Sequence, residues 1–398
     1  MFKISDRILN LEESQTLNTS AKAKKLKEKG FDVIDLSLGE TDFFTPDLVK
    51  QSAKLAIDQN YSTYSPVPGY LDLRETICKK LKRDNNLDYS PDQIVVSTGA
   101  KHSLMNIFLS VLDPSDEVII PAPYWVSYLT MVKFANGTPV IIRTTKENDY
   151  KITASDLEKS ITNKTKIFIF SSPCNPTGSV YSHDELESLC QVFRKYPNIL
   201  VISDEIYEYI NFTGEQTSIA SLDDMQKRCI VVNGLSKGYA MTGWRLGYMA
   251  GPVEISSAVS KLQSQFTSGA NSITQRAAIS ALIQNPSSIS GYIRDEFEKR
   301  KKLVYDELSK LNGVIPNNPG GAFYFFPDVS GLFTKRYKDI KIENSDKLCE
   351  LILENSHVSL VSGSAFGEPN CVRLSYATSQ EKLSQAIKRI GDFISCCN

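Results

Sequence analysis

Short apolar segments alternate with amphipathic ones through the middle of the chain, and this alternation constrains the fold more than any other feature. Five segments have the pattern of buried strands: residues 93–97, 117–120, 166–171, 198–203 and 229–232. A helical pattern at residues 72–83 precedes the first of them, and others lie between later ones, at residues 101–112 and 183–195. Apolar strands that alternate with helices are typical of a mostly parallel sheet covered on both faces. We therefore expect an α/β fold built on such a sheet.

The pattern changes towards the C-terminus, and the chain of 398 residues is too long for one ordinary core. After Gly313, strands at about 322–326 and 371–376 bracket a helix at 345–355. This order predicts a second, smaller α+β domain. The expected division is an arm and part of the small domain at 1–45, a large domain at 46–295 and a small domain at 296–398.

Two helices carry patterns that predict their caps and buried faces. Thr45 and Pro46 predict the N-cap and first position of a helix reaching about residue 59. Its expected buried side chains are Leu48, Ala53, Ala56 and Ile57. Thr378 and Glu381 predict a capping box at the last helix. Residues 253–285 read as one helical segment.

Charge and composition argue against several functional classes. Lys and Arg number 45 against 46 Asp and Glu, so the basic excess of a nucleic-acid-binding protein is absent. Three histidines, and eight cysteines without a C-x-x-C pair, predict no metal site. The sequence has no apolar run of membrane-spanning length and no apolar leader at its start. We expect a cytoplasmic protein that binds neither nucleic acid nor membrane.

The residues that could take part in binding or catalysis lie at the carboxyl ends of the predicted strands. Ligands of doubly wound sheets bind at that edge. The five ends deliver, in chain order, Gly99-Ala100-Lys101, Tyr124-Trp125, Asn175, Asp204 with Tyr207, and Lys237. Each has an ordinary alternative when taken alone: core packing for the aromatic rings, a common turn for Asn-Pro-Thr-Gly, and a surface position for the lysine. A helix start that binds anions is also weak evidence by itself.

Together, these groups suit a flat, phosphorylated pyridine that bears an aldehyde. A lysine amine attacks the carbonyl carbon, and an aspartate pairs with the ring nitrogen. The aromatic ring stacks on the pyridine, and the phenol and amide reach its hydroxyl. The helix start and an arginine, Arg245, hold the phosphate.

The motifs that carry these residues also resemble a known family. They read DLSLGETDFFTP, STYSPVPGY, VVSTGAKHSL, IIPAPYWVSY, SSPCNPTG, ISDEIYE, NGLSKGYAMTGWRLGY, GGAFYFFP, SGSAFG and VRLSYATS. In this order they resemble the fold-type I pyridoxal-phosphate aminotransferases of class I/II. The resemblance is closest to the bacterial aspartate aminotransferase branch that also contains prephenate aminotransferases. It covers nearly the whole chain.

The resemblance implies pyridoxal 5'-phosphate as cofactor, with a role for each matching position. Lys237 matches the Schiff-base lysine, Asp204 the partner of the ring nitrogen, and Tyr207 a partner of the ring hydroxyl. The other cofactor positions are Asn175 at the ring hydroxyl, Trp125 stacked on the ring, and Gly99, Ala100, Ser236 and Arg245 at the phosphate. Tyr64 matches a tyrosine that reaches the phosphate of the neighbouring subunit, which implies a homodimer with shared active sites.

On the substrate side, the resemblance implies that Arg373 clamps the α-carboxylate and that Gly39 contacts it through the backbone, beside Trp125 and Asn175. The expected reaction moves an amino group from an L-amino acid, aspartate first, to a 2-oxo acid such as 2-oxoglutarate. Where relatives carry Lys or Arg for a distal carboxylate, this chain has Glu12, which leaves Lys101 as the candidate cation.

Other functions stay open at this point. The donor could be aromatic, or the specificity broad. A lyase, a decarboxylase or an acyl-transferring synthase of the same fold type would share Lys237 and Asp204. A non-catalytic regulator would keep the fold without needing the full set of site residues.

Overall fold

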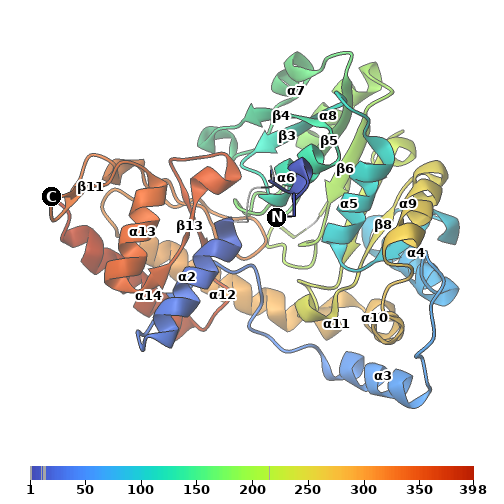
Figure 1. Ribbon diagram of the computed structural model, residues 1–398, viewed down its shortest axis with the longest axis horizontal. Helices are drawn as coiled ribbons and strands as arrows, with labels where there is room; N and C mark the ends of the chain where they lie inside the picture. Colours follow the sequence, from blue (N-terminus) through green and yellow to red (C-terminus); the bar gives the residue numbers. More distant parts are fainter. Residues whose placement is uncertain (1, 10, 12–14, 215) are drawn as a thin grey trace.

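A seven-stranded sheet forms the centre of the larger lobe in the computed structural model, which describes residues 2–9, 11, 15–214 and 216–398 (Figure 1). Its strand order is β2-β8-β7-β6-β5-β3-β4. The strands are β2 (Ile94–Ser97), β3 (Glu117–Ala122), β4 (Thr138–Arg143), β5 (Thr165–Ser171), β6 (Leu200–Asp204), β7 (Cys229–Gly234) and β8 (Gly247–Ala250). Only β8 runs antiparallel to its neighbours, so the expected, mostly parallel sheet is confirmed.

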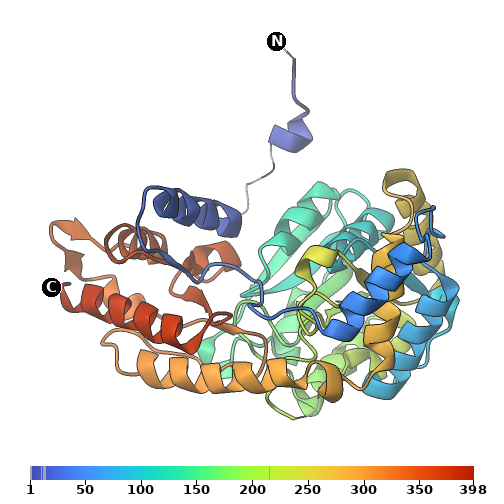
Figure 2. The ribbon, with the colours of Figure 1, turned by 90° about the horizontal axis from the view of Figure 1, so that it is seen from below.

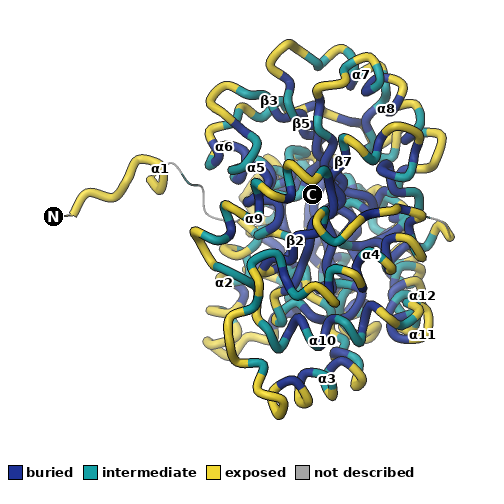
Figure 3. Tube along the Cα trace, turned by 90° about the vertical axis from the view of Figure 1, so that its right-hand side faces the viewer, coloured by how far each residue is buried: buried dark blue, intermediate teal, exposed yellow. Residues whose placement is uncertain are grey.

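Alternating side chains of the strands feed two cores, one on each face of the sheet. Val231 belongs to one core, whereas Ile230 and Val232 belong to the other, as the two-residue period of a strand requires. The helices of this lobe are α3 (Asp47–Asp58), α4 (Leu71–Asn85), α5 (Ala100–Val111), α6 (Ser127–Phe134), α7 (Ala154–Ser160), α8 (His183–Lys195), α9 (Val253–Phe266), α10 (Ser272–Ile283) and α11 (Pro286–Ile289). Buried residues concentrate at the sheet, and the outer turns of the helices are exposed (Figure 3).

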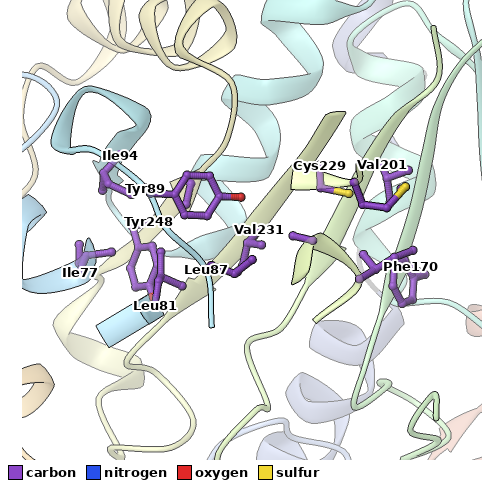
Figure 4. Packing of buried hydrophobic residues seen from close by; sticks show 14 of the residues in the cluster. Ile77, Leu81, Leu87, Tyr89, Ile94, Phe170, Val201, Cys229, Val231 and Tyr248 are labelled. Atoms are coloured by element: carbon purple, nitrogen blue, oxygen red, sulfur yellow. The ribbon is translucent and has the colours of Figure 1, made fainter. Parts of the chain in front are cut away.

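The two cores have different helices as their outer walls. The core around Val231 includes side chains of α4, α8 and α10, and Figure 4 shows part of it, with Ile77 and Leu81 of α4 near Tyr248. The opposite core includes side chains of α5, α6 and α9. The sheet is therefore held rigidly between two apolar layers, and its strand ends are fixed platforms for polar groups.

The smaller lobe contains the C-terminal part of the chain and a segment near the N-terminus. Its longest helix, α12 (Gly291–Leu308), lies along its underside and reaches the larger lobe (Figure 2). A three-stranded antiparallel sheet has the order β13-β14-β9. The remaining elements are α2 (Gln15–Glu28), β1 (Ile34–Asp35), β9 (Tyr324–Phe325), β10 (Arg336–Tyr337), β11 (Ile340–Lys341), α13 (Ser345–Ser356), β12 (Val358–Ser359), β13 (Val361–Ser362), β14 (Val372–Ser375) and α14 (Gln380–Ser395). Strand β1 pairs with β12, which ties the N-terminal segment to this lobe.

Before this segment, a short helix, α1 (Asp6–Leu9), lies in a stretch that extends outward from the two lobes in Figure 2. Its apolar side chains are exposed, Ile8 and Leu9 among them. Within the described part of the chain, no helix combines the length and the apolar character that crossing a membrane requires.

Several local predictions were wrong. Thr45 does not cap α3, whose N-cap is Pro46, because its hydroxyl donates a 2.7 Å hydrogen bond to the carbonyl of Ala240 instead. Helix α14 is capped by Ser379 rather than Thr378, with the Ser379 hydroxyl accepting from the Lys382 N–H. The helical segment 253–285 is interrupted between α9 and α10. Leu48 and Ile57 of α3 are exposed rather than buried.

Candidate active site

A cavity of about 420 Å³ lies at the carboxyl ends of the parallel strands, where the sequence predicted the site. It is lined by every predicted site residue except Gly99 and Tyr64: Gly39, Ala100, Lys101, Trp125, Asn175, Asp204, Tyr207, Ser236, Lys237, Arg245 and Arg373. Ser171 at the end of β5 pairs in register with Asp204 at the end of β6, so adjacent strands deliver their polar groups at the same level.

Lys237 follows the end of β7 by three residues and directs its amine into the cavity. The Nζ atom donates a 2.5 Å hydrogen bond to the carbonyl oxygen of Gly39. Burial lowers the pKa of Lys237 to about 8, and the charges of Arg373 and Arg245 contribute in the same direction. A substantial fraction of this amine is therefore neutral near pH 8 and able to attack a carbonyl carbon.

Asp204 ends β6 and is 5% exposed. Its Oδ2 atom accepts a 2.7 Å hydrogen bond from the hydroxyl of Tyr128, and Oδ1 accepts one of 3.3 Å from the backbone N–H of Ile206. Burial nevertheless raises the pKa of the carboxyl to about 6. Among the described residues no basic side chain forms an ion pair with Asp204, so a cationic group of a ligand would complete its environment.

Arg373 lies in β14 and is 2% exposed. Nη1 donates a 2.9 Å hydrogen bond to Oδ1 of Asn175, and Nη2 donates to the carbonyl of Ser37. Nε is buried without a hydrogen-bond partner among the described residues, and burial lowers the pKa of the guanidinium. A buried guanidinium without a carboxylate is costly unless a ligand supplies one.

The segment from Ser37 to Glu40 lies beside the cavity and forms hydrogen bonds with three of the residues that line it. Its carbonyls at Ser37 and Gly39 accept hydrogen bonds from Arg373 and Lys237. The carboxylate of Glu40 accepts a hydrogen bond from the Thr242 hydroxyl. The N-terminal segment therefore closes over the lysine and the arginine from one side.

The start of α5 and Arg245 form the anion-binding part of the cavity. Gly99 has a φ of +90° and precedes the first helical residue, Ala100. A Cβ atom at Gly99 would lie 2.5 Å from Nη2 of Arg245, so only glycine permits this close approach. The N–H groups of Ala100 and Lys101, at the start of the first helical turn, and the guanidinium together suit a phosphate. Gly99 itself does not line the cavity but makes this arrangement possible.

Trp125 and Lys101 form the adjoining wall. The indole packs edge-to-face on Tyr128, with ring centroids 5.4 Å apart. Nζ of Lys101 lies 5.1 Å from the centroid of the Trp125 ring. Burial and the charge of Arg245 lower the pKa of Lys101. Because Lys101 lines the cavity, its amine can meet an anionic group that reaches this wall.

Tyr64 lies outside the cavity and is 95% exposed. The loop that carries it is fixed by Gln275, which accepts a 2.9 Å hydrogen bond from the N–H of Tyr70 and donates one of 2.9 Å to the hydroxyl of Ser65. Tyr64 is therefore presented outward by an ordered loop. Glu12, on which the donor prediction depends, lies outside the described residues, whereas Thr16 and Leu17 just after it line the cavity.

The sequence-based reasoning missed two tyrosines of the cavity. Tyr128 bonds Asp204, and the hydroxyl of Tyr324 lies 2.8 Å from that of Tyr207. Tyr324 also lies beneath the guanidinium of Arg373, which is 4.5 Å from the ring centroid. Both tyrosines occur inside the motifs PYWVSY and GGAFYFFP, but neighbouring aromatic and apolar residues make them look like core.

The whole chain resembles known proteins in sequence and in fold. A family model described as aminotransferase class I and II matches residues 32–390. The aspartate/prephenate aminotransferase of Cereibacter sphaeroides is 44% identical over 393 residues, which cover 98% of each chain. The structure of the aspartate aminotransferase from Rhizobium meliloti matches with a TM-score of 0.97 at 38% identity and covers 100% of both chains. That of Thermus thermophilus, solved with maleate, matches with a TM-score of 0.93 at 35% identity and covers 99% of this chain and 100% of that one.

Proposed function

Because the chain belongs to the class I and II aminotransferase family, we propose that it transfers the amino group of aspartate to 2-oxoglutarate with pyridoxal 5'-phosphate as cofactor. The observation that carries the proposal is the convergence of Lys237, Asp204 and Arg373 on one cavity. An amine with a lowered pKa, a buried carboxylate and a buried guanidinium without a carboxylate are the groups that this chemistry needs.

The residues of the cavity fit the cofactor. Asp204 offers a buried carboxylate to a protonated ring nitrogen, and Gly99 with Arg245 offers a cradle that a Cβ atom would fill. Ser236, Ala100 and Trp125 line the same cavity, where they would contact the phosphate and the ring face. When bound, pyridoxal phosphate supplies an aldehyde that joins the substrate amine and a protonated pyridine that accepts electrons from the substrate.

The reaction then depends on four side chains. Lys237 would hold the cofactor and would also move the proton at the substrate Cα, a task that a positioned base accelerates by roughly 10²–10⁴-fold. Asp204 would keep the proton on the ring nitrogen, and Tyr207 would donate to the ring hydroxyl oxygen. The side-chain oxygen of Asn175 accepts a hydrogen bond from Arg373. The amide nitrogen of Asn175 is therefore left to donate to the ring hydroxyl oxygen, as a second donor beside Tyr207. Two rounds of these steps, with the amino acid and then the 2-oxo acid, complete a ping-pong cycle.

Arg373 binds the substrate α-carboxylate through two parallel N–H groups, beside the backbone of Gly39. Lys101 is the cation for the distal carboxylate of aspartate. The relative from Thermus thermophilus is described with maleate, a dicarboxylate, which supports this choice of donor. Arg373 at the α-carboxylate also favours transamination over the lyase, decarboxylase and synthase alternatives.

We also propose a homodimer in which Tyr64 reaches the phosphate of the neighbouring subunit. Exposed apolar side chains of α10 and of the two helices that contact it, α3 and α4, support it, since a second copy would bury them. They are Leu48, Leu55, Ile57, Leu71 and Ile283. Sedimentation of the purified protein tests the oligomeric state, and we expect a dimer. Titration with pyridoxal phosphate tests the role of Tyr64, and we expect a weaker affinity in Tyr64→Phe. A monomer at working concentration would refute the dimer.

The decisive test of the function is a donor screen with 2-oxoglutarate as acceptor. Purified protein is saturated with pyridoxal phosphate, and initial rates are measured with aspartate, tyrosine, phenylalanine and alanine. We expect the largest kcat/KM with aspartate. Faster turnover of tyrosine or phenylalanine would replace aspartate with an aromatic donor. No amino transfer from any amino acid, despite bound cofactor, would refute an aminotransferase function.

A further inference from the structure

Tyr324 lies where three groups of the cavity meet, and its side chain is completely buried. Its hydroxyl is 2.8 Å from the hydroxyl of Tyr207, and its ring faces the guanidinium of Arg373. On the third side the backbone of Gly39 approaches so closely that a Cβ atom there would lie 2.5 Å from the Tyr324 hydroxyl. One side chain thus contacts a cofactor partner, a substrate partner and the segment that covers both.

We propose that Tyr324 is a positioning residue with two separable tasks: its hydroxyl directs the Tyr207 phenol towards the cofactor, and its ring holds the Arg373 guanidinium for the substrate carboxylate. The inference rests on the proposed function, in which Tyr207 and Arg373 make those two contacts. It adds a residue that links the cofactor side of the cavity to the substrate side.

The first task follows from the hydrogen count of the two phenols. Each hydroxyl has one hydrogen, and the 2.8 Å contact uses one of the two. Within the described part of the chain neither hydroxyl has another hydrogen-bond partner. When Tyr324 donates, the hydrogen of Tyr207 is left for the oxygen of the cofactor ring, and the donation polarises Tyr207 into a stronger donor.

The second task follows from the surroundings of Arg373. The guanidinium carbon lies 4.5 Å from the centroid of Tyr324 and 5.0 Å from that of Phe366. Hydrogen bonds to Asn175 and Ser37 fix two of its nitrogens. Attraction between a cation and an aromatic face is strongest where water is excluded, as it is here. The ring of Tyr324 therefore keeps the guanidinium in one orientation before a substrate binds.

Two substitutions separate the tasks. Tyr324→Phe keeps the ring and removes the hydroxyl, whereas Tyr324→Leu removes both. The matched control is Tyr376→Phe, because Tyr376 is also fully buried in the same lobe and its hydroxyl donates one hydrogen bond, of 3.1 Å, to the carbonyl of Ala322. Tyr376 does not line the cavity, so its variant measures the general effect of losing a buried hydroxyl.

Two measurements on the cofactor-loaded protein test the two tasks of Tyr324 separately. The first is the pH midpoint of the absorbance change of the cofactor bound to Lys237. A donor at the ring oxygen stabilises negative charge there and lowers this midpoint, so weakening Tyr207 should raise it by about half a pH unit in Tyr324→Phe and Tyr324→Leu. The second is the dissociation constant of maleate, followed by its effect on the same absorbance. It should rise about tenfold in Tyr324→Leu and change less than about twofold in Tyr324→Phe.

The outcomes distinguish this inference from the proposed function. Tyr324→Phe with an unchanged midpoint would overturn the role of the hydroxyl, and so would an equal shift in Tyr376→Phe. Tyr324→Leu with wild-type affinity for maleate would overturn the role of the ring. Neither measurement needs turnover, whereas the proposed function is tested by the turnover of the wild-type protein in the donor screen.

Discussion

The hydroxyl of Tyr128 donates a 2.7 Å hydrogen bond to Oδ2 of Asp204, across the floor of the cavity between α6 and the end of β6. This contact offsets part of the cost of burying a carboxylate, and the pKa of Asp204 still stays raised, at about 6. The residual cost is typical of a group held in place for a ligand rather than for stability.

Asp204→Asn should therefore stabilise the protein without cofactor while abolishing its activity. The pKa of the carboxyl is about 6 in the folded state against 3.8 when unperturbed, so its destabilising effect develops as the pH rises from about 4 to 6 and persists above. The difference between the two pKa values corresponds to a gain of about 3 kcal/mol at pH 7. Urea unfolding at pH 7 measures it, and the gain should disappear near pH 4. A variant that is less stable at pH 7, or that keeps wild-type turnover, would contradict this assignment.

Lys237 should capture pyridoxal phosphate at a rate that increases as the pH rises through about 8. Burial lowers the pKa of this amine from 10.5 to about 8, and only the neutral form attacks the aldehyde. Stopped-flow absorbance of the cofactor-free protein mixed with pyridoxal phosphate gives the profile, with Lys237→Arg as the control that should form no covalent product. A midpoint near that of an ordinary lysine would argue against a desolvated nucleophile.

The charged residues at the strand ends could be predicted from the sequence more easily than the sheet's outer strands or the tyrosines that line the cavity. Asp204 and Lys237 could be predicted because Asp204 ends, and Lys237 follows, a short strand that begins with an apolar run, and a charged group in that place is unusual. Strand β4 has mostly exposed or half-buried side chains at the sheet edge, and β8 is only four residues long, so neither has a strong pattern.

The two missed tyrosines have a different cause. Tyr128 and Tyr324 stand among apolar and aromatic residues, and whether a phenol points into a core or a cavity depends on tertiary contacts. The same cause explains Leu48 and Ile57, which were predicted to be buried and are exposed. An amphipathic pattern indicates that these side chains are covered, but not whether the chain itself or a second copy covers them.

Lys101→Met should lower kcat/KM for aspartate about tenfold or more and leave kcat/KM for alanine nearly unchanged. The Lys101 amine lines the cavity beside Trp125 and is the described cation proposed for a distal carboxylate, which alanine lacks. Glu12→Lys should change selectivity in the opposite direction if residue 12 faces that carboxylate. Steady-state rates of the Lys101→Met variant with aspartate and with alanine test this role. Equal losses for aspartate and alanine would place Lys101 at the cofactor phosphate, near Arg245, rather than at the substrate.

Gly99→Ala should weaken cofactor binding by more than its backbone strain explains, and Gly30→Ala provides the comparison. Both glycines have φ near +90°, so alanine is strained at either site by about 1–3 kcal/mol. A Cβ atom at Gly30 would meet nothing within 4 Å, whereas one at Gly99 would lie 2.5 Å from Nη2 of Arg245. Both variants should lose thermal stability, but only Gly99→Ala should displace the guanidinium and lose affinity for pyridoxal phosphate, measured by fluorescence titration. Equal cofactor affinities in the two variants would show that Arg245 does not need this close approach to hold the phosphate.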